Sequence, residues 1–168
     1  MKASDGRRSA GLQIPPESLS SLTEFRARLA GGGRRAGIEL LNQRTSHRFT
    51  GIFQFAGEFL KCIELVDKWD WTVRRCDDVP IGSAYCAHLQ RTGEPLVVAD
   101  GTVDVRVPWM RNKPVTSYCG AVIETPAGQP WGALCHFDMS PCESNAGEVD
   151  LLVAAARLLW PALGSVAV

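Results

Sequence analysis

Two strand-like stretches and the turn between them decide the fold of this chain: residues 117–124 read SYCGAVIE, residues 125–129 read TPAGQ, and residues 130–137 read PWGALCHF. Both outer stretches are rich in aromatic, β-branched and small apolar residues, which favour strands, and the middle one has turn residues. Gly120 and Gly132 allow close backbone packing at strand positions, and Gly128 suits a turn that needs a positive φ. The region therefore predicts an antiparallel hairpin.

A second hairpin is predicted upstream, where residues 49–55 and 59–66 are two β-rich runs separated by Ala56-Gly57-Glu58. Helical spacing of apolar residues precedes and follows these strands. Hairpins in place of regular strand-helix-strand alternation predict an α+β fold with an antiparallel sheet. The other predicted elements are helices at 16–30, 34–45, 82–91 and 148–163, a strand at 96–99 and a long loop at 101–116, with a glycine stop at 31–33 and a helix cap at Ser144 or Asn145.

Length and composition indicate one globular domain of 168 residues, with 45% hydrophobic and 21% charged side chains. The 18 basic residues balance the 18 acidic ones, which argues against nucleic-acid binding. We found neither a signal peptide nor an apolar run of about 18 residues that would span a membrane, so the expected location is the cytoplasm. The six cysteines are then expected as free thiols, and their spacing suggests no metal site. No cofactor is expected.

The hairpin from Ser117 to Asp138, followed by Pro141 and a closing amphipathic helix, resembles the GAF domain family. Upstream features fit the same family: a short helix with Tyr85-Cys86 after Pro80-Ile81-Gly82, a strand ending at Asp100, and Asp104-Val105-Arg106 in the next loop. The resemblance covers residues 34–163. It implies a central antiparallel sheet flanked by helices, with the N- and C-terminal helices packed together. We expect a disordered lead-in at 1–15 and a single domain at 16–168.

In GAF-like folds the ligand pocket lies between the sheet and the short helix plus long loop, here residues 82–91 and 101–116. Aromatic walls with one guanidinium would suit a small planar or anionic metabolite. The resemblance therefore implies a sensor or regulatory module for a small molecule, acting through oligomerisation or a separate signalling protein. The candidate binding residues are Trp69, Trp71, Tyr85, Cys86, Arg106, Trp109 and Tyr118.

Two alternatives stay open at this point. The first is an enzyme similar to the free methionine-(R)-sulfoxide reductase branch of the family, with Cys76, Cys86 and Cys119 as the candidate catalytic thiols. The loop at 101–116 lacks the cysteine that this branch carries there, and a buried thiol such as Cys119 behaves as a small hydrophobe. The second alternative is a dimerisation scaffold whose pocket is filled by its own side chains.

A homodimer is also expected, because GAF-like domains commonly pack their terminal helices into a bundle. The two amphipathic ends, residues 16–30 and 148–163, are suited to that role. Leu158, Leu159, Trp160 and Leu163 are expected to form an apolar surface wider than one sheet face covers.

Overall fold

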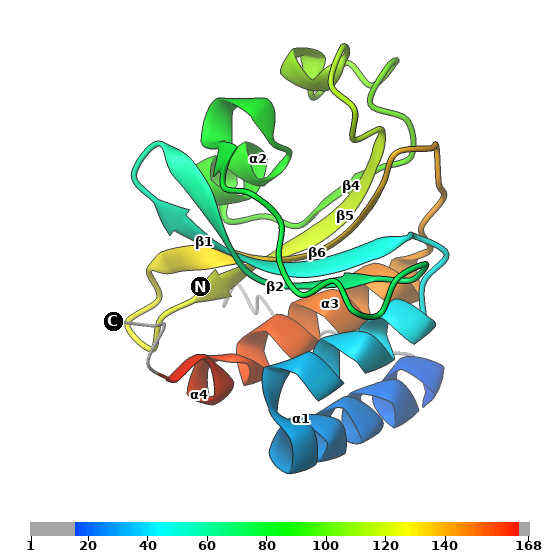
Figure 1. Cartoon of the computed structure of the whole chain (residues 1–168), viewed down its shortest axis with the longest axis vertical. Coiled ribbons are helices and arrows are strands. Elements are labelled where there is room, and N and C mark those ends of the chain that lie inside the picture. Colours follow the sequence, from blue (N-terminus) through cyan, green and yellow to red (C-terminus); the bar gives the residue numbers. More distant parts are fainter. Residues whose placement is uncertain (1–15, 165–168) are drawn as a thin grey trace, which may run out of the picture.

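The computed structural model describes residues 16–164, so the lead-in predicted at 1–15 lies outside the described residues. The α+β expectation is confirmed, with one sheet and helices on both of its faces (Figure 1). The elements in chain order are α1 Pro16–Gln43, β1 Phe49–Ala56, β2 Phe59–Asp67, β3 Val79–Pro80, α2 Cys86–Thr92, β4 Leu96–Val98, β5 Ser117–Glu124, β6 Pro130–Asp138, α3 Ala146–Leu158 and α4 Trp160–Leu163, with 3₁₀ turns at Ile81–Ser83 and Pro108–Met110.

The six strands form one antiparallel sheet in the order β3-β2-β1-β6-β5-β4. Both predicted hairpins are confirmed: β1 pairs with β2 and β5 with β6, and β1 and β6 join the two hairpins in the middle. Gly128 has φ 79° in the turn after β5, which is the left-handed conformation expected there. The two-residue strand β3 was not predicted, because it forms only by pairing with the distant start of β2.

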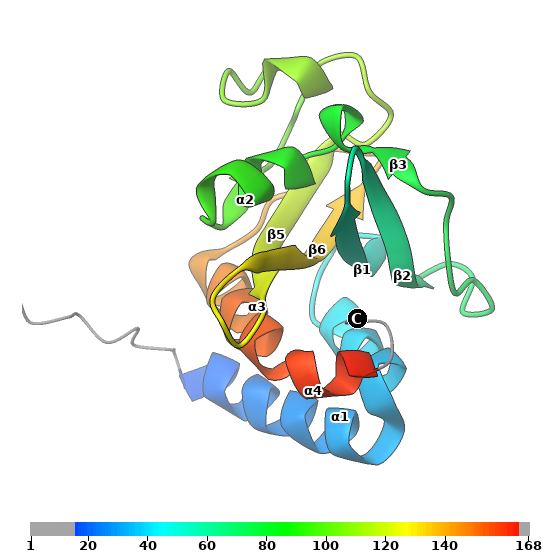
Figure 2. The same cartoon turned by 90° about the vertical axis from the view of Figure 1, so that its left-hand side faces the viewer.

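Helices α1 and α3 lie together against one face of the sheet, and α2 lies on the other face (Figure 2). The predicted break between two N-terminal helices is found at Gly33, whose φ of 72° and ψ of −169° are not helical. The cap of α3 is Asn145, whose Oδ1 accepts the Glu148 N–H at 2.8 Å. No helix among residues 16–164 has the length and apolar character needed to cross a bilayer.

The expectation of an uncovered apolar surface at the C-terminal helix is wrong for two of its four residues. Leu159 and Leu163 are fully buried and belong to the core between the sheet and α1, while Leu158 and Trp160 are partly buried against that core. The predicted single helix also ends at Leu158, and α4 starts again at Trp160 with Pro161 in its first turn. α4 lies against α1 and α3, and its Leu163 is part of the core on that side of the sheet.

The sheet separates two apolar clusters. One lies between the sheet and the helices α1, α3 and α4. The other lies between the opposite face of the sheet, α2 and the 3₁₀ turns that precede and follow it. Alternation along each strand produces this division: in β5, for example, Tyr118 belongs to the α2 side and Cys119 to the α1 side. The α2 side contains the cavity described below.

Candidate functional site

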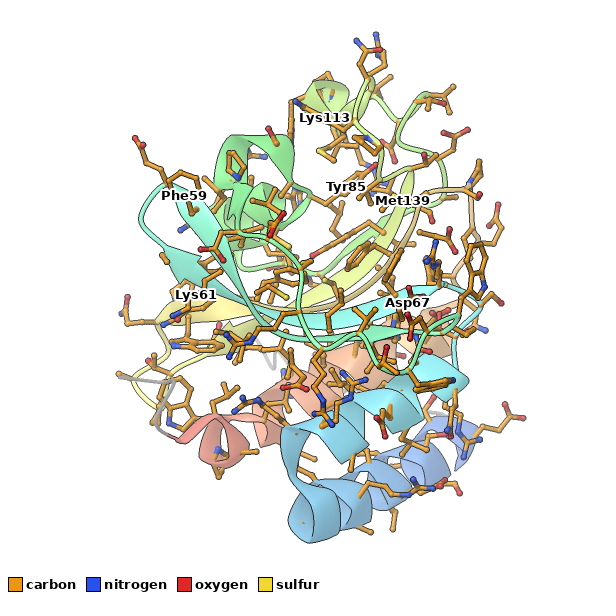
Figure 3. The ribbon with its side chains drawn as sticks, viewed as in Figure 1. Phe59, Lys61, Asp67, Tyr85, Lys113 and Met139 are labelled. Carbon is orange, nitrogen blue, oxygen red and sulfur yellow. The ribbon has the colours of Figure 1, made fainter. Side chains whose placement is uncertain are left out.

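An apolar cavity of about 370 Å³ lies on the α2 side of the sheet. Its floor is formed by strands β1, β2, β5 and β6, and its walls by Ser83–Cys86, Met110 and Val115, with Cys76 to Val79 and Met139 completing the lining. Figure 3 shows two of the lining residues, Tyr85 and Met139, on the side of the sheet away from α1. The volume is that of a small-molecule site.

Most of the interior is hydrocarbon. Three phenylalanines (Phe49, Phe53 and Phe137) line it from the central strands, and Leu60, Leu65 and Met110 add aliphatic surface. None of these residues is among the seven candidate binding residues predicted from the sequence. Their alternation in β1, β2 and β6 indicates one buried face, but which face borders a cavity depends on where α2 lies. Among the lining residues Asp77 is the only charged one. The cavity therefore has no cationic side chain that could pair with an anionic ligand.

Two tyrosines give the cavity polar groups with fixed directions. Tyr85 and Tyr118 stack with ring centroids 5.1 Å apart, and the Tyr85 hydroxyl donates to the Val115 carbonyl at 2.8 Å. Burial raises the pKa of Tyr85 to about 12, and burial also raises the pKa of Tyr118. Both hydroxyls are therefore neutral near pH 7 and act by hydrogen bonding.

Three thiols, those of Cys76, Cys86 and Cys135, also line the cavity. The Cys86 Sγ shares a hydrogen bond of 3.1 Å with the Tyr118 hydroxyl. A hydrogen bond from Cys135 lowers the pKa of Cys86, against the opposing effect of burial, while burial raises the pKa of Cys135. Cys119, the third candidate catalytic thiol, lies in the core on the α1 side, and burial raises its pKa to about 12. The sheet thus separates it from Cys76 and Cys86.

Trp69 and Trp71, two of the candidate binding residues, do not line the cavity. They lie after β2 with side chains 74% and 47% exposed. The Arg48 guanidinium lies 3.9 Å from the centroid of one Trp69 ring and forms two 2.8 Å hydrogen bonds to Asp67. These charged and aromatic groups stabilise the surface at the end of β2, because stacking and bidentate pairing hold the guanidinium in place.

Arg106 and Trp109 also lie outside the cavity lining. The Arg106 guanidinium donates to Asp104 and, at 2.6 Å, to the Val97 carbonyl, so it stabilises its own loop. Trp109 packs behind the wall, and its indole N–H donates to the Ala84 carbonyl at 3.1 Å. Of the seven candidates, the structure brings Tyr85, Cys86 and Tyr118 together at one cavity. No group of three His, Cys, Asp or Glu side chains within residues 16–164 is arranged to hold a metal ion.

The family model that matches this chain is that of the GAF domain, over residues 25–163. No curated protein has a matching sequence. Among solved structures, the GAF domain of an Acinetobacter phosphoenolpyruvate-protein phosphotransferase has a TM-score of 0.70 and 8% identity, covering 89% of this chain and 94% of that one.

Two further solved structures show the range of proteins with this fold. The free methionine-R-sulfoxide reductase of Neisseria meningitidis, determined with its substrate, has a TM-score of 0.65 and 14% identity, covering 84% of this chain and 85% of its own. The chromophore-binding domain of a bacteriophytochrome from R. palustris has a TM-score of 0.67 and 12% identity, covering 88% of this chain and 61% of its own. At such identities the likeness concerns the fold alone. With the family model spanning most of its length, the chain belongs to the GAF domain family.

Proposed function

We propose that this GAF domain is a sensor that binds a small, largely apolar and uncharged molecule in the cavity between α2 and the sheet. The observation that carries the proposal is the cavity itself: about 370 Å³, walled by phenylalanine, leucine and methionine side chains. Transfer of apolar surface into such a site is favourable by about 25 cal/mol per Å². The family relationship supports the same role, because two structures of this fold are described with a substrate or as a chromophore-binding domain.

The chemistry of the lining narrows the ligand class. Asp77 is the only charged residue there, and the Arg106 guanidinium is paired with Asp104 outside it. An anionic metabolite, which the sequence suggested, would be desolvated without a compensating cation. The uncharged side chains that can form hydrogen bonds there are the hydroxyls of Ser83, Tyr85 and Tyr118 and the thiols of Cys76, Cys86 and Cys135. A small apolar molecule with one or two polar atoms suits this lining.

Native mass spectrometry of the purified full chain, compared with its denatured mass, tests the proposal first. A noncovalent excess mass per subunit that is lost on denaturation supports a co-purifying ligand and starts its identification. If the mass is bare, the apolar fluorophore N-phenyl-1-naphthylamine serves as a probe. Saturable binding supports an open site, and failure to bind favours the scaffold alternative.

Reductase activity remains the second candidate, because Cys76 and Cys86 both line the cavity. The position of Cys119 across the sheet leaves that candidate without the third thiol assigned to it. Turnover of free methionine-(R)-sulfoxide with a dithiol reductant, lost in Cys86→Ser, would establish an enzyme. Probe binding without any turnover of the sulfoxide would exclude the reductase and support the sensor.

A further inference from the structure

Cys62 and Cys76 lie side by side at the rim of the cavity, although 14 residues separate them in sequence. The Cys76 backbone N–H donates to the Cys62 Sγ at 3.3 Å. Cys62 is buried on the cavity side of β2, whereas Cys76 is exposed and also lines the cavity. One sulfur is therefore held in the core and the other is accessible from solvent.

The backbone around the two cysteines has the spacing of adjacent strands. The Leu65 N–H donates to the Arg74 carbonyl at 2.7 Å, and Leu60 pairs with Val79. Between these two contacts the chain from Arg74 to Val79 runs beside β2, and their register places Asp77 opposite Cys62 and Cys76 one residue further along. A disulfide bridges Cα atoms about 4.4–6.8 Å apart. The 3.3 Å contact from the Cys76 nitrogen to the Cys62 Sγ already places Cys76 against the sulfur with which it would bond.

We propose that Cys62 and Cys76 are a redox-responsive pair whose disulfide ties the rim segment, residues 74–79, to β2 and restricts passage into the cavity. The segment carries Cys76, Asp77 and Val79, which all line the cavity. In the reduced protein two contacts to β2 hold its ends, and the disulfide would add a covalent one in the middle. The effect on ligand exchange rests on the proposed function, whereas the disulfide itself does not.

The electrostatic surroundings help one sulfur of the pair to ionise. A hydrogen bond from the Cys76 thiol lowers the pKa of Cys62, and the Cys76 backbone N–H and the Arg75 charge act in the same direction against burial. The same contact and burial raise the pKa of Cys76, so the pair loses one proton first and its single thiolate is the reactive species.

The oxidant we name is a hydroperoxide. A thiolate of the pair attacks one peroxide oxygen, the O–O bond breaks, and the leaving oxygen takes a proton as water or an alcohol. The sulfenic acid formed on that sulfur is then attacked by the other sulfur of the pair. The S–S bond forms, the S–O bond breaks, and water leaves with the remaining proton. Two thiols are oxidised by two electrons and one peroxide is reduced, and a dithiol reverses the change.

Peptide mapping of the full chain after hydrogen peroxide treatment tests the pairing. Trypsin separates Cys62 (residues 62–68) from Cys76 and Cys86 (residues 76–91), and chymotrypsin cuts after Tyr85 to separate Cys76 from Cys86. We expect the number of thiols titrated after denaturation to fall from six to four, a mass loss of about 2 Da, and a crosslink between the Cys62 and Cys76 peptides. Cys76→Ser should lose this response and Cys142→Ser, which changes another accessible thiol, should keep it. No crosslink, or one to Cys86 or Cys135 instead, overturns the proposal.

The gating effect has its own measurement. Stopped-flow dissociation of N-phenyl-1-naphthylamine should be slower by roughly fivefold or more in oxidised than in reduced protein, and equal in the two forms of Cys76→Ser. Equal rates in the wild-type protein, with the disulfide present, overturn the gating. Absence of probe binding in the reduced protein counts against the proposed function, while the peptide map alone decides the thiol pair.

Discussion

Gly132 lies in β6 where that strand pairs with β1, and its missing side chain is a packing requirement. A Cβ at this position would overlap the Phe53 carbonyl oxygen in β1. Gly120 in β5 has a similar role, because a Cβ there would overlap the Tyr118 ring. The close packing predicted at both glycines is confirmed by this geometry.

Gly132→Ala is therefore expected to destabilise the fold. Pushing β1 and β6 apart at the middle of the sheet should cost about 1–3 kcal/mol, the usual range for overpacking. Urea denaturation measures the loss. Gly82→Ala is the matched control, because no atom lies within 4 Å of a Cβ added there. Equal stabilities of the two variants would contradict the packing argument.

We expect the buried His136 to make the free energy of unfolding depend on pH in the acid range. It is buried on the α1 side of β6, with Nδ1 2.7 Å from the Thr50 hydroxyl oxygen. Burial lowers the pKa of His136 from 6.5 to about 3, with Glu148 raising it and the charges of His47 and Lys68 lowering it. Between these two pH values the unfolded chain binds a proton that the native state does not, so stability falls as the pH falls.

His136→Gln should flatten this dependence by about one proton, or about 1.4 kcal/mol per pH unit between about pH 6 and 4. Urea denaturation across that interval measures the slope for both proteins. A variant slope equal to the wild-type slope would show that His136 does not carry the effect.

At the scale of the element, local sequence signals place most of the helices and strands. The glycine run indicated the break found at Gly33, and β-rich runs on either side of turn residues located both hairpins. The elements missed are short: β3, which needs β2 as a partner, and the 3₁₀ turn at Pro108–Met110, whose Trp109 bonds to the distant Ala84. Contacts between distant residues define them, so no local pattern indicates them.

Asn145→Ala should destabilise α3 by about 1 kcal/mol, because the Glu148 N–H loses its acceptor at the N-cap. Thermal unfolding followed by circular dichroism measures the change. Glu143→Ala, an exposed neighbour outside the helix, is the control. A loss of the same size in both variants would rule out a capping effect.

At the scale of the whole molecule, the sheet isolates the cavity from the helices α1 and α3. Ala84→Phe should fill part of the cavity, since Ala84 lines it beside Tyr85. We expect at least a tenfold loss of N-phenyl-1-naphthylamine affinity, about 1.4 kcal/mol. Ala30→Phe on the exposed side of α1 is the control. Titration by fluorescence compares them, and unchanged binding by Ala84→Phe would place the probe elsewhere.

The homodimer stays a prediction, with a smaller apolar surface than the sequence suggested. The side chains of Leu159 and Leu163 are buried in the core of their own chain and cannot contact a second copy. Leu19 of α1, in contrast, is half exposed. We expect a dimer through the outer face of α1 and α3. Light scattering at micromolar concentration measures it, and a monomer would contradict it.

Sequence alone determined the α+β class, the two hairpins and the family, because β-rich runs, turn residues and strand glycines are local signals. It also brought Tyr85, Cys86 and Tyr118 into the candidate site. Tertiary structure decided that Trp69, Trp71 and Arg106 lie at the surface and that Phe53 and Phe137 line the cavity. The physical reason is that a side chain's periodicity shows only that it is buried or exposed. Whether it meets a neighbour or a cavity depends on how α2 and the rim segment cover the sheet.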